Sequence, residues 1–311
     1  MASTPASCSG TAAAPVAAAP ARRDGERAGV ARMVGGGLLL GTLGVFVEEA
    51  GQHPLTTVWF RCAFGLLALL AWGALSGRLV ELRLRGAALA AALATGMLMI
   101  ASWALFFAAI ARTSIGVATV VFHVQPLWVL ALGAWWLHEP VSHRQASAVL
   151  LALAGLALAS GVVDGAAAGR EASASYAWGL LMCLAASFSY AAVTLIAKLA
   201  RGVSSFALAW WQCAAGAVAL AAWPLLDGWP AAGAAWGWLA GLGVIHTGLA
   251  YVVLYAGMAR LSTGRIALLQ FVYPAAAVAI DWLVYGRALS VVQLTGVALM
   301  AAALIGVKRI R

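Results

Sequence analysis

The chain has 311 residues, of which 64% are hydrophobic and only 9% are charged. A soluble domain carries about 25% charged residues, so the ten acidic and nineteen basic side chains cannot cover a water-soluble protein of this size. The composition excludes a soluble globular protein and predicts a polytopic membrane protein. Because one span with its connection needs about 25 to 30 residues, the chain has room for about ten helices.

The net charge of +9 would suggest a nucleic-acid partner in a soluble protein, but in a membrane protein it must first be tested against orientation. The four cysteines are scattered, and Cys62, Cys183 and Cys213 fall inside apolar stretches, where a thiol behaves as a small hydrophobic group. We therefore expect no disulfide framework and no metal site.

The N-terminal residues 1–29 are rich in Ala, Pro, Ser and Gly and carry a short charged cluster at 22–27. They contain too little apolar surface to pack, so we expect a disordered cytoplasmic tail. A cleaved signal peptide fits poorly, because the alanine-rich part precedes the arginines instead of following them.

From residue 30 onward, long apolar stretches alternate with short polar breaks. Each stretch is long enough to cross about 30 Å of hydrocarbon as a helix, and the stretches are continuously apolar, whereas barrel strands would alternate. We therefore predict an all-α membrane protein with ten transmembrane helices, at 30–50, 55–76, 86–110, 115–136, 145–163, 174–198, 204–224, 234–257, 264–284 and 289–308.

The distribution of basic residues predicts the orientation. With the N-terminus in the cytoplasm and ten crossings, fifteen of the nineteen basic residues fall on the cytoplasmic side, whereas only Arg112, Arg170 and Arg287 fall outside and Arg61 lies within a span. This asymmetry satisfies the positive-inside rule with both termini in the cytoplasm, and we expect a multi-pass protein of the inner (plasma) membrane. The fifteen are Arg22, Arg23, Arg27, Arg32, Arg78, Arg83, Arg85, Arg144, Lys198, Arg201, Arg260, Arg265, Lys308, Arg309 and Arg311.

An internal repeat appears when the chain is shifted by 148 residues. Matches other than Ala and Leu fall in one register without a gap, and Trp103 falls on Tyr251. Because each unit holds five predicted helices, the two units, 30–163 and 174–308, must cross the membrane in opposite directions. The matched pairs are Arg112 and Arg260, Ser114 and Ser262, Gly116 and Gly264, Val124 and Val272, Pro126 and Pro274, Ser142 and Ser290, and Gln145 and Gln293.

Inverted repeats are typical of secondary transporters, in which the binding site lies at the repeat interface. Pro126 and Pro274 occupy matching positions near the centres of their helices, where each removes a backbone hydrogen bond and can kink or soften the helix. Proline is tolerated in membrane helices, but a symmetry-related pair favours a role as hinges.

Three stretches resemble the drug/metabolite transporter superfamily, in particular its EamA-type members. They are HPLTTVWFRCAFGLLAL, with Arg61; FAAIARTSIGVATVVFHVQPLWVLALGAWWLHEPVS, ending near Glu139; and its counterpart AGMARLSTGRIALLQFVYPAAAVAIDWLVYGRALS. The resemblance covers residues 30–308 and implies ten helices in two inverted halves around a central cavity. It also implies export of a small metabolite, most often an amino acid or a related compound.

The chain departs from that pattern at the end of the fourth and ninth helices. The usual glutamate after a glycine is kept at Glu139, where it follows His138, but Arg287 stands at the matching position in the second half. The arginine position in the second helix is typical of the resemblance. This favours a structural role for Arg61, either snorkelling outward or pairing with Glu48 or Glu49, although a substrate carboxylate could also bind there.

Embedded polar groups are candidates for substrate binding or coupling. His246 lies near the middle of the eighth span between Gly243 and Gly248, and could accept a proton or bind substrate; a neutral ring bonded to a facing Ser or Thr is the alternative. His123 has the same two interpretations. Asp281 could be a cation or proton site, or a hydrated acid paired with Arg287.

Aromatic residues complete the candidate site. The family's fold would place Trp103, Tyr190, Tyr251, Tyr255 and Tyr273 around the central cavity, and Trp103 and Tyr251 are the pair expected to face substrate. Gln270 is a further candidate.

No motif supports ATP-driven transport or hydrolysis, and the histidines of HEPVSH have the wrong spacing for a zincin. We therefore expect no enzymatic activity and no cofactor. The predicted protein is a secondary transporter that moves a small metabolite by alternating access, with that metabolite and the lipid bilayer as its partners. The sequence leaves open whether the protein forms a homodimer. It also leaves open two other functions, an uncoupled facilitator or exchanger and an integral membrane enzyme acting on lipids.

Overall fold

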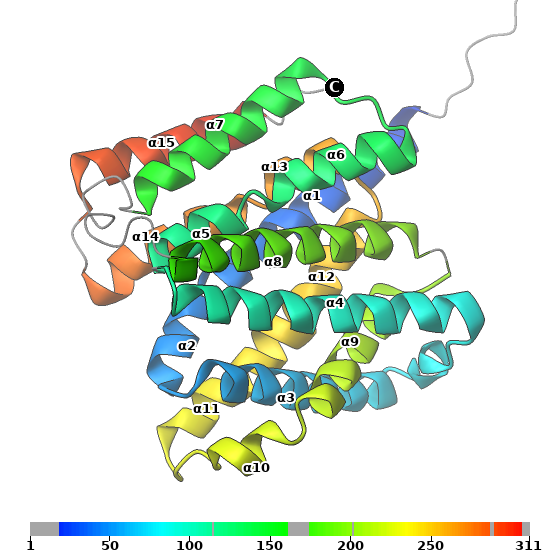
Figure 1. The fold of residues 1–311 in the computed structure, drawn as a ribbon. Helices are drawn as coiled ribbons and strands as arrows, with labels where there is room; N and C mark the ends of the chain where they lie inside the picture. The colour runs from blue at the N-terminus through cyan, green and yellow to red at the C-terminus, as the bar shows by residue number, and fades with distance from the viewer. Residues whose placement is uncertain (1–18, 114, 161–173, 201, 287–288, 307–311) are drawn as a thin grey trace, which may run out of the picture.

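A computed structural model describes residues 19–113, 115–160, 174–200, 202–286 and 289–306. Every regular element in these ranges is helical, so the predicted all-α class is confirmed. Helices α8, α4 and α3 lie one below another across the bundle, α7 and α15 pair at one edge, and α10 and α11 lie at the opposite edge (Figure 1).

The helices follow the predicted apolar stretches, several of which are divided. Their bounds are α1 Ala19–Gly41, α2 Leu43–Ala50, α3 Pro54–Leu75, η1 Leu79–Leu82, α4 Gly86–Ile110, α5 Ile115–Phe122, α6 Gln125–Leu137, α7 His143–Ala159, α8 Ala174–Leu199, α9 Ser205–Ala219, α10 Trp223–Asp227, α11 Ala234–Gly241, η3 Leu242–Leu249, α12 Ala250–Met258, α13 Thr263–Leu269, α14 Val272–Tyr285 and α15 Val291–Gly306.

Seven helical segments of the described chain are long and apolar enough to cross a membrane when contiguous helices are joined, and α7 and α15 are shorter apolar helices. The seventh predicted span is represented by the 15-residue α9 followed by the short α10. The chain therefore has the architecture of a multi-pass membrane protein, and the count of ten crossings stays a prediction.

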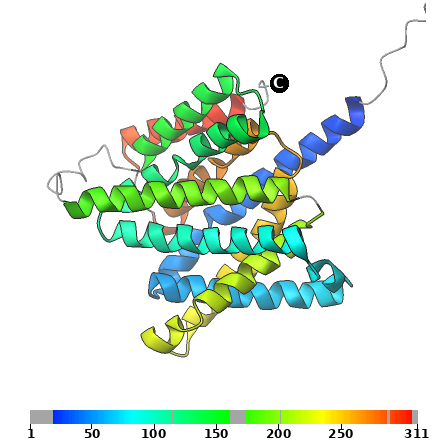
Figure 2. The ribbon, with the colours of Figure 1, turned by 45° about the vertical axis from the view of Figure 1, so that its right-hand side comes forward.

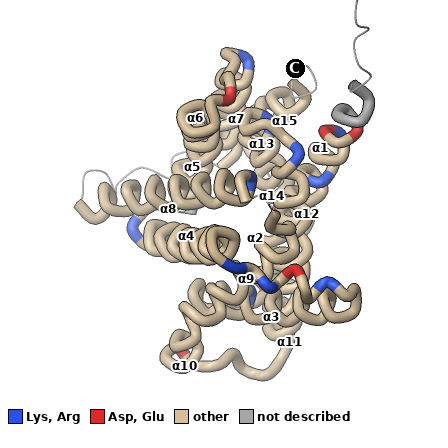
Figure 3. The backbone as a smooth tube through the Cα atoms, turned by 90° about the vertical axis from the view of Figure 1, so that its right-hand side faces the viewer, with Lys and Arg blue, Asp and Glu red and all other residues tan. Residues whose placement is uncertain are grey.

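The start of α1 and the end of α15 lie at the same end of the bundle (Figures 1 and 2). An even number of crossings produces this arrangement. Figure 3 looks at that end, and most of the basic segments that it colours surround the end facing the viewer.

The expected tail needs one correction. Helix α1 begins at Ala19, inside the stretch that we expected to be disordered, and Figure 2 shows this part of α1 projecting beyond the bundle. Glu26 accepts a hydrogen bond from Arg265 at 2.9 Å, and this ion pair anchors the projecting turns to the second half of the chain. Residues 1–18 lie outside the described residues.

The 148-residue shift also relates the helices themselves. It places Gly86–Ile110 of α4 on Ala234–Met258, the range occupied by α11, η3 and α12. It also relates two helix starts with the same hydrogen bonds. Ser142 and Gln145 cap α7, and Ser290 and Gln293 repeat the contact before α15, with N to Oε1 distances of 2.9 Å and N to Oγ distances of 3.2 Å in both.

Helices pack closely where glycines meet. A Cβ atom on Gly155 of α7 would lie 2.7 Å from the carbonyl oxygen of Gly296 on α15. A Cβ atom on Gly243 of η3 would lie 2.8 Å from the backbone nitrogen of Gly65 on α3. The backbones of these pairs are in direct contact, as small residues allow in membrane helix packing.

Candidate functional site

A small cavity lies where α3, α4, α9, η3 and α12 meet. The centre of a water molecule can occupy about 10 Å³ of this cavity, so the cavity has room for about one water molecule. Nine residues line it: Cys62, Met99, Ile100, Trp103, Ala209, Gln212, Cys213, Thr247 and Tyr251. Both predicted halves of the chain contribute to this wall.

Trp103 and Tyr251, the pair expected to face substrate, are both in the cavity wall. Their ring centroids are 6.5 Å apart, and their positions are related by the 148-residue shift. His123 and Phe271 are related in the same way, and their rings lie 6.4 Å apart. Repeat-related residues can touch only beside the axis that relates the two halves, so the cavity lies near that axis.

Arg61 adjoins the cavity. Only 5% of this residue is exposed. Its Nε donates a hydrogen bond to Thr247 Oγ1 at 3.1 Å, and its Cζ lies 4.6 Å from the centre of the Trp103 ring. The expected pairing with Glu48 or Glu49 is wrong, because none of the ion pairs within the described ranges includes Arg61. The guanidinium points instead to a partner that lies 186 residues away in the sequence.

Gln212 is a second polar member of the wall. Its Oε1 accepts a hydrogen bond from Tyr255 Oη at 2.5 Å. Its Nε2 is buried and has no hydrogen-bond partner in the part of the chain that the structure describes. Nothing in the motif or repeat pattern singled out Gln212, and its position among apolar residues on α9 was the available signal.

His246 lies on the π-helical turn η3 and is fully buried, with 0% exposed. Its Nε2 lies 2.7 Å from Thr42 Oγ1, and its Nδ1 lies 3.3 Å from the Gly241 carbonyl oxygen. Thr42 occupies the break between α1 and α2 and donates to the Leu39 carbonyl at 2.8 Å. His246 therefore joins the break in the first span to η3 and does not line the cavity.

The two predicted hinges follow helix breaks. Helix α5 ends at Phe122 and α6 begins at Gln125, so the break directly precedes Pro126. Helix α13 ends at Leu269 and α14 begins at Val272, so the corresponding break precedes Pro274. His123 and Gln270 lie in these breaks. The centroids of the His123 and Tyr273 rings are 5.9 Å apart. The Nε2 of Gln270 donates a hydrogen bond to Thr194 Oγ1 at 3.2 Å.

The remaining candidates, Tyr190 and Asp281, do not line the cavity, although the Tyr190 side chain is hydrogen-bonded to Tyr251 of the cavity wall. Tyr190 on α8 contacts Phe122, with ring centroids 5.8 Å apart. Asp281 lies on α14, partly exposed, and its expected partner Arg287 is outside the described residues.

Glu139 joins three segments. Its carboxylate accepts hydrogen bonds from the Nζ of Lys198 at the end of α8, and from the Thr263 backbone N–H and hydroxyl at the start of α13, the last two at 2.8 and 2.7 Å. Burial raises the pKa of the Glu139 carboxyl, but the bonds from Lys198 and Thr263 outweigh burial and hold this pKa below its usual range. We call these three residues the Glu139 cluster.

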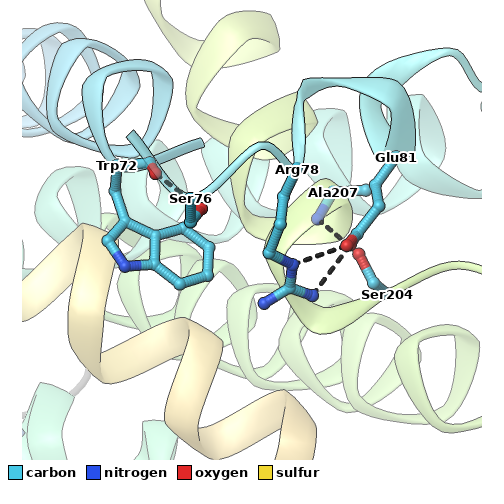
Figure 4. A network of polar contacts seen from close by, with 6 residues as sticks. All are labelled: Trp72, Ser76, Arg78, Glu81, Ser204 and Ala207. Atoms are coloured by element: carbon cyan, nitrogen blue, oxygen red, sulfur yellow. Dashed lines mark hydrogen bonds and ion pairs between the residues drawn. The ribbon is translucent and has the colours of Figure 1, made fainter. Parts of the chain in front are cut away.

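A second polar network fixes the connection between α3 and α4. Arg78 donates two hydrogen bonds to Glu81 at 2.5 and 2.9 Å, and Figure 4 shows both side chains beside Ser204, which caps the start of α9. The hydrogen bonds from Arg78 hold the pKa of Glu81 below its usual range. Trp211 of α9 donates to the Leu82 carbonyl at 3.1 Å, so this connection is attached to the second half of the chain.

Comparisons with known proteins agree with this architecture. A model of the EamA-like transporter family matches residues 27–161 and again 177–309. An uncharacterized transporter, YxxF, from Bacillus subtilis (strain 168) is 26% identical over 277 residues, which cover 88% of this chain and 87% of the relative. An uncharacterized transporter from Archaeoglobus fulgidus is 27% identical over 277 residues, covering 89% of this chain and 94% of the relative.

A solved structure described as "Crystal structure of protein" has the same fold. It superposes with a TM-score of 0.79 at 20% identity, and the match covers 92% of this chain and 96% of that one.

Proposed function

Because the chain belongs to the EamA-like transporter family, we propose that it is a secondary transporter that moves a small metabolite across the inner membrane by alternating access. The cavity between the two family-matched ranges carries this proposal. It adjoins the contact between the repeat-related Trp103 and Tyr251, and secondary transporters with inverted repeats bind substrate at such an interface.

The size of the cavity supports alternating access. Room for about one water does not admit a metabolite, so substrate entry requires the surrounding helices to move. The breaks before Pro126 and Pro274 are the proposed hinges. The Glu139 cluster joins α6, α8 and α13 at the basic end of the bundle and must open when the cavity opens toward that end.

The proposed direction is export, and the proposed substrate is an amino acid or a related compound. We place both ends of the chain in the cytoplasm, because most basic residues surround the end of the bundle that holds the start of α1 and the end of α15. Metabolite profiling of medium from cells with and without the protein tests both points. One compound class should accumulate outside only when the protein is present.

Proton coupling is proposed at His246. The Thr42 hydroxyl donates to Leu39, so it can only accept from Nε2, and the Gly241 carbonyl can only accept from Nδ1. Only a doubly protonated ring makes all three bonds at once.

Replacing His246 with Gln tests the coupling. We expect transport in proteoliposomes to lose its dependence on a pH gradient, because glutamine keeps hydrogen bonding but does not titrate. An unchanged pH-gradient dependence would falsify coupling at His246 and favour the second candidate, an uncoupled facilitator or exchanger. Asp281→Asn is the matched comparison for the other proposed coupling residue.

We place this protein among transporters and not among membrane enzymes that act on lipids. The family description and the names of both relatives support this assignment.

A further inference from the structure

Arg61 is a buried cation, and no ion pair among the described residues includes it. Its Nε bonds to Thr247, and its flat face rests on Trp103. Among the hydrogen bonds of the described residues, the one from Nε to Thr247 is the bond that Arg61 makes. Burying a charge without a counter-charge is costly, so this guanidinium is expected to meet an anion during the transport cycle.

Gln212 supplies a second donor without a partner at the same cavity. Only 8% of this residue is exposed, and its Nε2 is buried. Tyr255 Oη already donates to Oε1, which leaves the amide NH₂ group as the part that needs an acceptor. A guanidinium and an amide N–H at one cavity select for a group that only accepts hydrogen bonds.

The rest of the wall is mostly apolar and aromatic. Met99, Ile100 and Ala209 contribute aliphatic surface, and Trp103 and Tyr251 contribute rings. The wall contains no aspartate or glutamate that would neutralise Arg61 from inside the protein. The 148-residue shift places Arg61 on Ala209, so only one half brings a cation to the cavity.

From these contacts we infer that the cavity binds the carboxylate of a small metabolite with an apolar body, and that Arg61 and Gln212 hold the carboxylate. This inference rests on the proposed transport function and names its substrate class. The carboxylate receives charge-assisted hydrogen bonds from the guanidinium and one bond from the amide, and the apolar body lies against Trp103 and Tyr251.

The test compares two probes of the same shape. Purified protein in lipid nanodiscs is titrated with 3-phenylpropionate and with 3-phenylpropionamide, and binding is followed by the rise in the midpoint of thermal unfolding. We expect the acid to bind at least about tenfold more tightly than the amide, because only the acid offers a charged acceptor. Equal binding of the two probes would overturn the inference.

The key variant is Gln212→Glu. It keeps Arg61 and can still accept from Tyr255, but it puts a carboxylate of the protein into the wall of the cavity that Arg61 adjoins. We expect binding of 3-phenylpropionate to fall at least about tenfold. The matched control is Val218→Ala on the same helix, because Val218 is 77% exposed, and it should bind as the wild type does.

A second pair of variants covers the case in which Gln212→Glu does not fold. Arg61→Lys keeps the charge and should retain part of the preference for the acid, whereas Arg61→Gln should lose that preference. If a folded Gln212→Glu or Arg61→Gln protein distinguishes acid from amide as the wild type does, the carboxylate site is wrong.

The experiments distinguish a failure of the proposed transport function from a failure of the proposed carboxylate site. If the protein moves other solutes into liposomes while 3-phenylpropionate neither binds nor competes, the inference is wrong and the transport function stands. If the acid binds as expected and no solute crosses the bilayer, the carboxylate site stands and the proposed transport is wrong.

Discussion

His138 is the one residue other than glycine with a positive φ angle among those that the structure describes. Its φ of 52° ends helix α6 in the left-handed conformation. The 148-residue shift places it on Gly286, which ends α14 with φ 63°. The second half therefore uses the residue that this conformation favours, whereas the first half holds a side chain there at a cost of about 1 kcal/mol.

Replacing His138 with Gly should therefore stabilise the protein by up to about 1 kcal/mol. Thermal unfolding in detergent checks this, with His143→Gly as the control. His143 lies at the first position of α7, where glycine brings no relief of strain and slightly weakens the helix. A His138→Gly protein that melts below the wild type would contradict this account of the helix end.

Glu139 is the next residue after His138, and it makes the stability of the folded protein depend on pH. Its pKa is held below the usual value, so its carboxylate stabilises the folded state above about pH 4.3 and stops doing so as the pH falls through the lower folded pKa. Glu139→Gln should lower stability by about 1 kcal/mol at neutral pH, since the pair with Lys198 is partly exposed.

Unfolding midpoints measured from pH 7 to pH 3.5 check the pH dependence. The wild type and Glu139→Gln should differ most at neutral pH and converge as the solution becomes more acidic. Lys198→Gln should reduce the same dependence from the other side of the pair. Parallel curves for the wild type and Glu139→Gln would show that the carboxylate does not titrate in the way the cluster requires.

At the scale of elements, the π-helical turn η3 organises the site. It lets Thr247 donate to the Leu242 carbonyl at 2.9 Å, five residues back, while Thr247 accepts from Arg61. It also holds His246 against Thr42. The corresponding part of α4 is regular α-helix, so this turn belongs to the second half alone. Such bulges occur often at functional sites.

Gly243 allows η3 to approach α3. A Cβ atom there would lie 2.8 Å from the Gly65 nitrogen, so Gly243→Ala should force the two helices apart at a cost of about 2 kcal/mol. Gly237→Ala on the neighbouring α11 has nothing within 4 Å and should be neutral or stabilising by up to about 1 kcal/mol. Thermal unfolding curves of the two variants, compared with that of the wild type, test whether only Gly243→Ala lowers the stability. Similar losses in both would indicate a general intolerance of alanine.

The elements also show what a sequence can predict. The third span was expected at 86–110, and α4 occupies Gly86–Ile110, because hydropathy decides where a helix can cross a membrane. The break at Thr42 and the π-turn were not predicted, whereas the prolines Pro126 and Pro274 predicted that their helices bend near the observed breaks. Hydropathy is the same on both sides of a break, and these features depend on partners that are distant in the sequence.

The residues of the candidate site also fall into two groups, those that the sequence predicted and those that it did not. Trp103 and Tyr251 could be found because the repeat pairs their positions and the resemblance places their helices around a central cavity. The partner of Arg61 was missed, because Thr247 comes from the opposite half, and Gln212 was missed, because a single amide in an apolar helix resembles an ordinary packing residue.

At the scale of the whole molecule, orientation is the property that the repeat and the charges jointly predict. Cysteines introduced at Arg83 and at Ala231, in a background without the native cysteines, test it. Ala231 lies in the exposed connection before α11, and Arg83 follows η1 at the basic end. A membrane-impermeant thiol reagent should label position 231 in intact cells and position 83 only after permeabilisation. The reverse pattern would invert the proposed orientation.

The Glu139 cluster has no twin at the other end of the protein. The 148-residue shift turns Glu139, Lys198 and Thr263 into Arg287, Ala50 and Ile115, which cannot form the same bonds. Two identical halves would give inward-open and outward-open states of equal free energy. In the proposed alternating-access cycle, the Glu139 cluster would favour the state closed at the basic end, and ligand arriving from that face would first have to offset the cost of opening it. A single binding site would then show unequal apparent affinities at the two faces of the membrane.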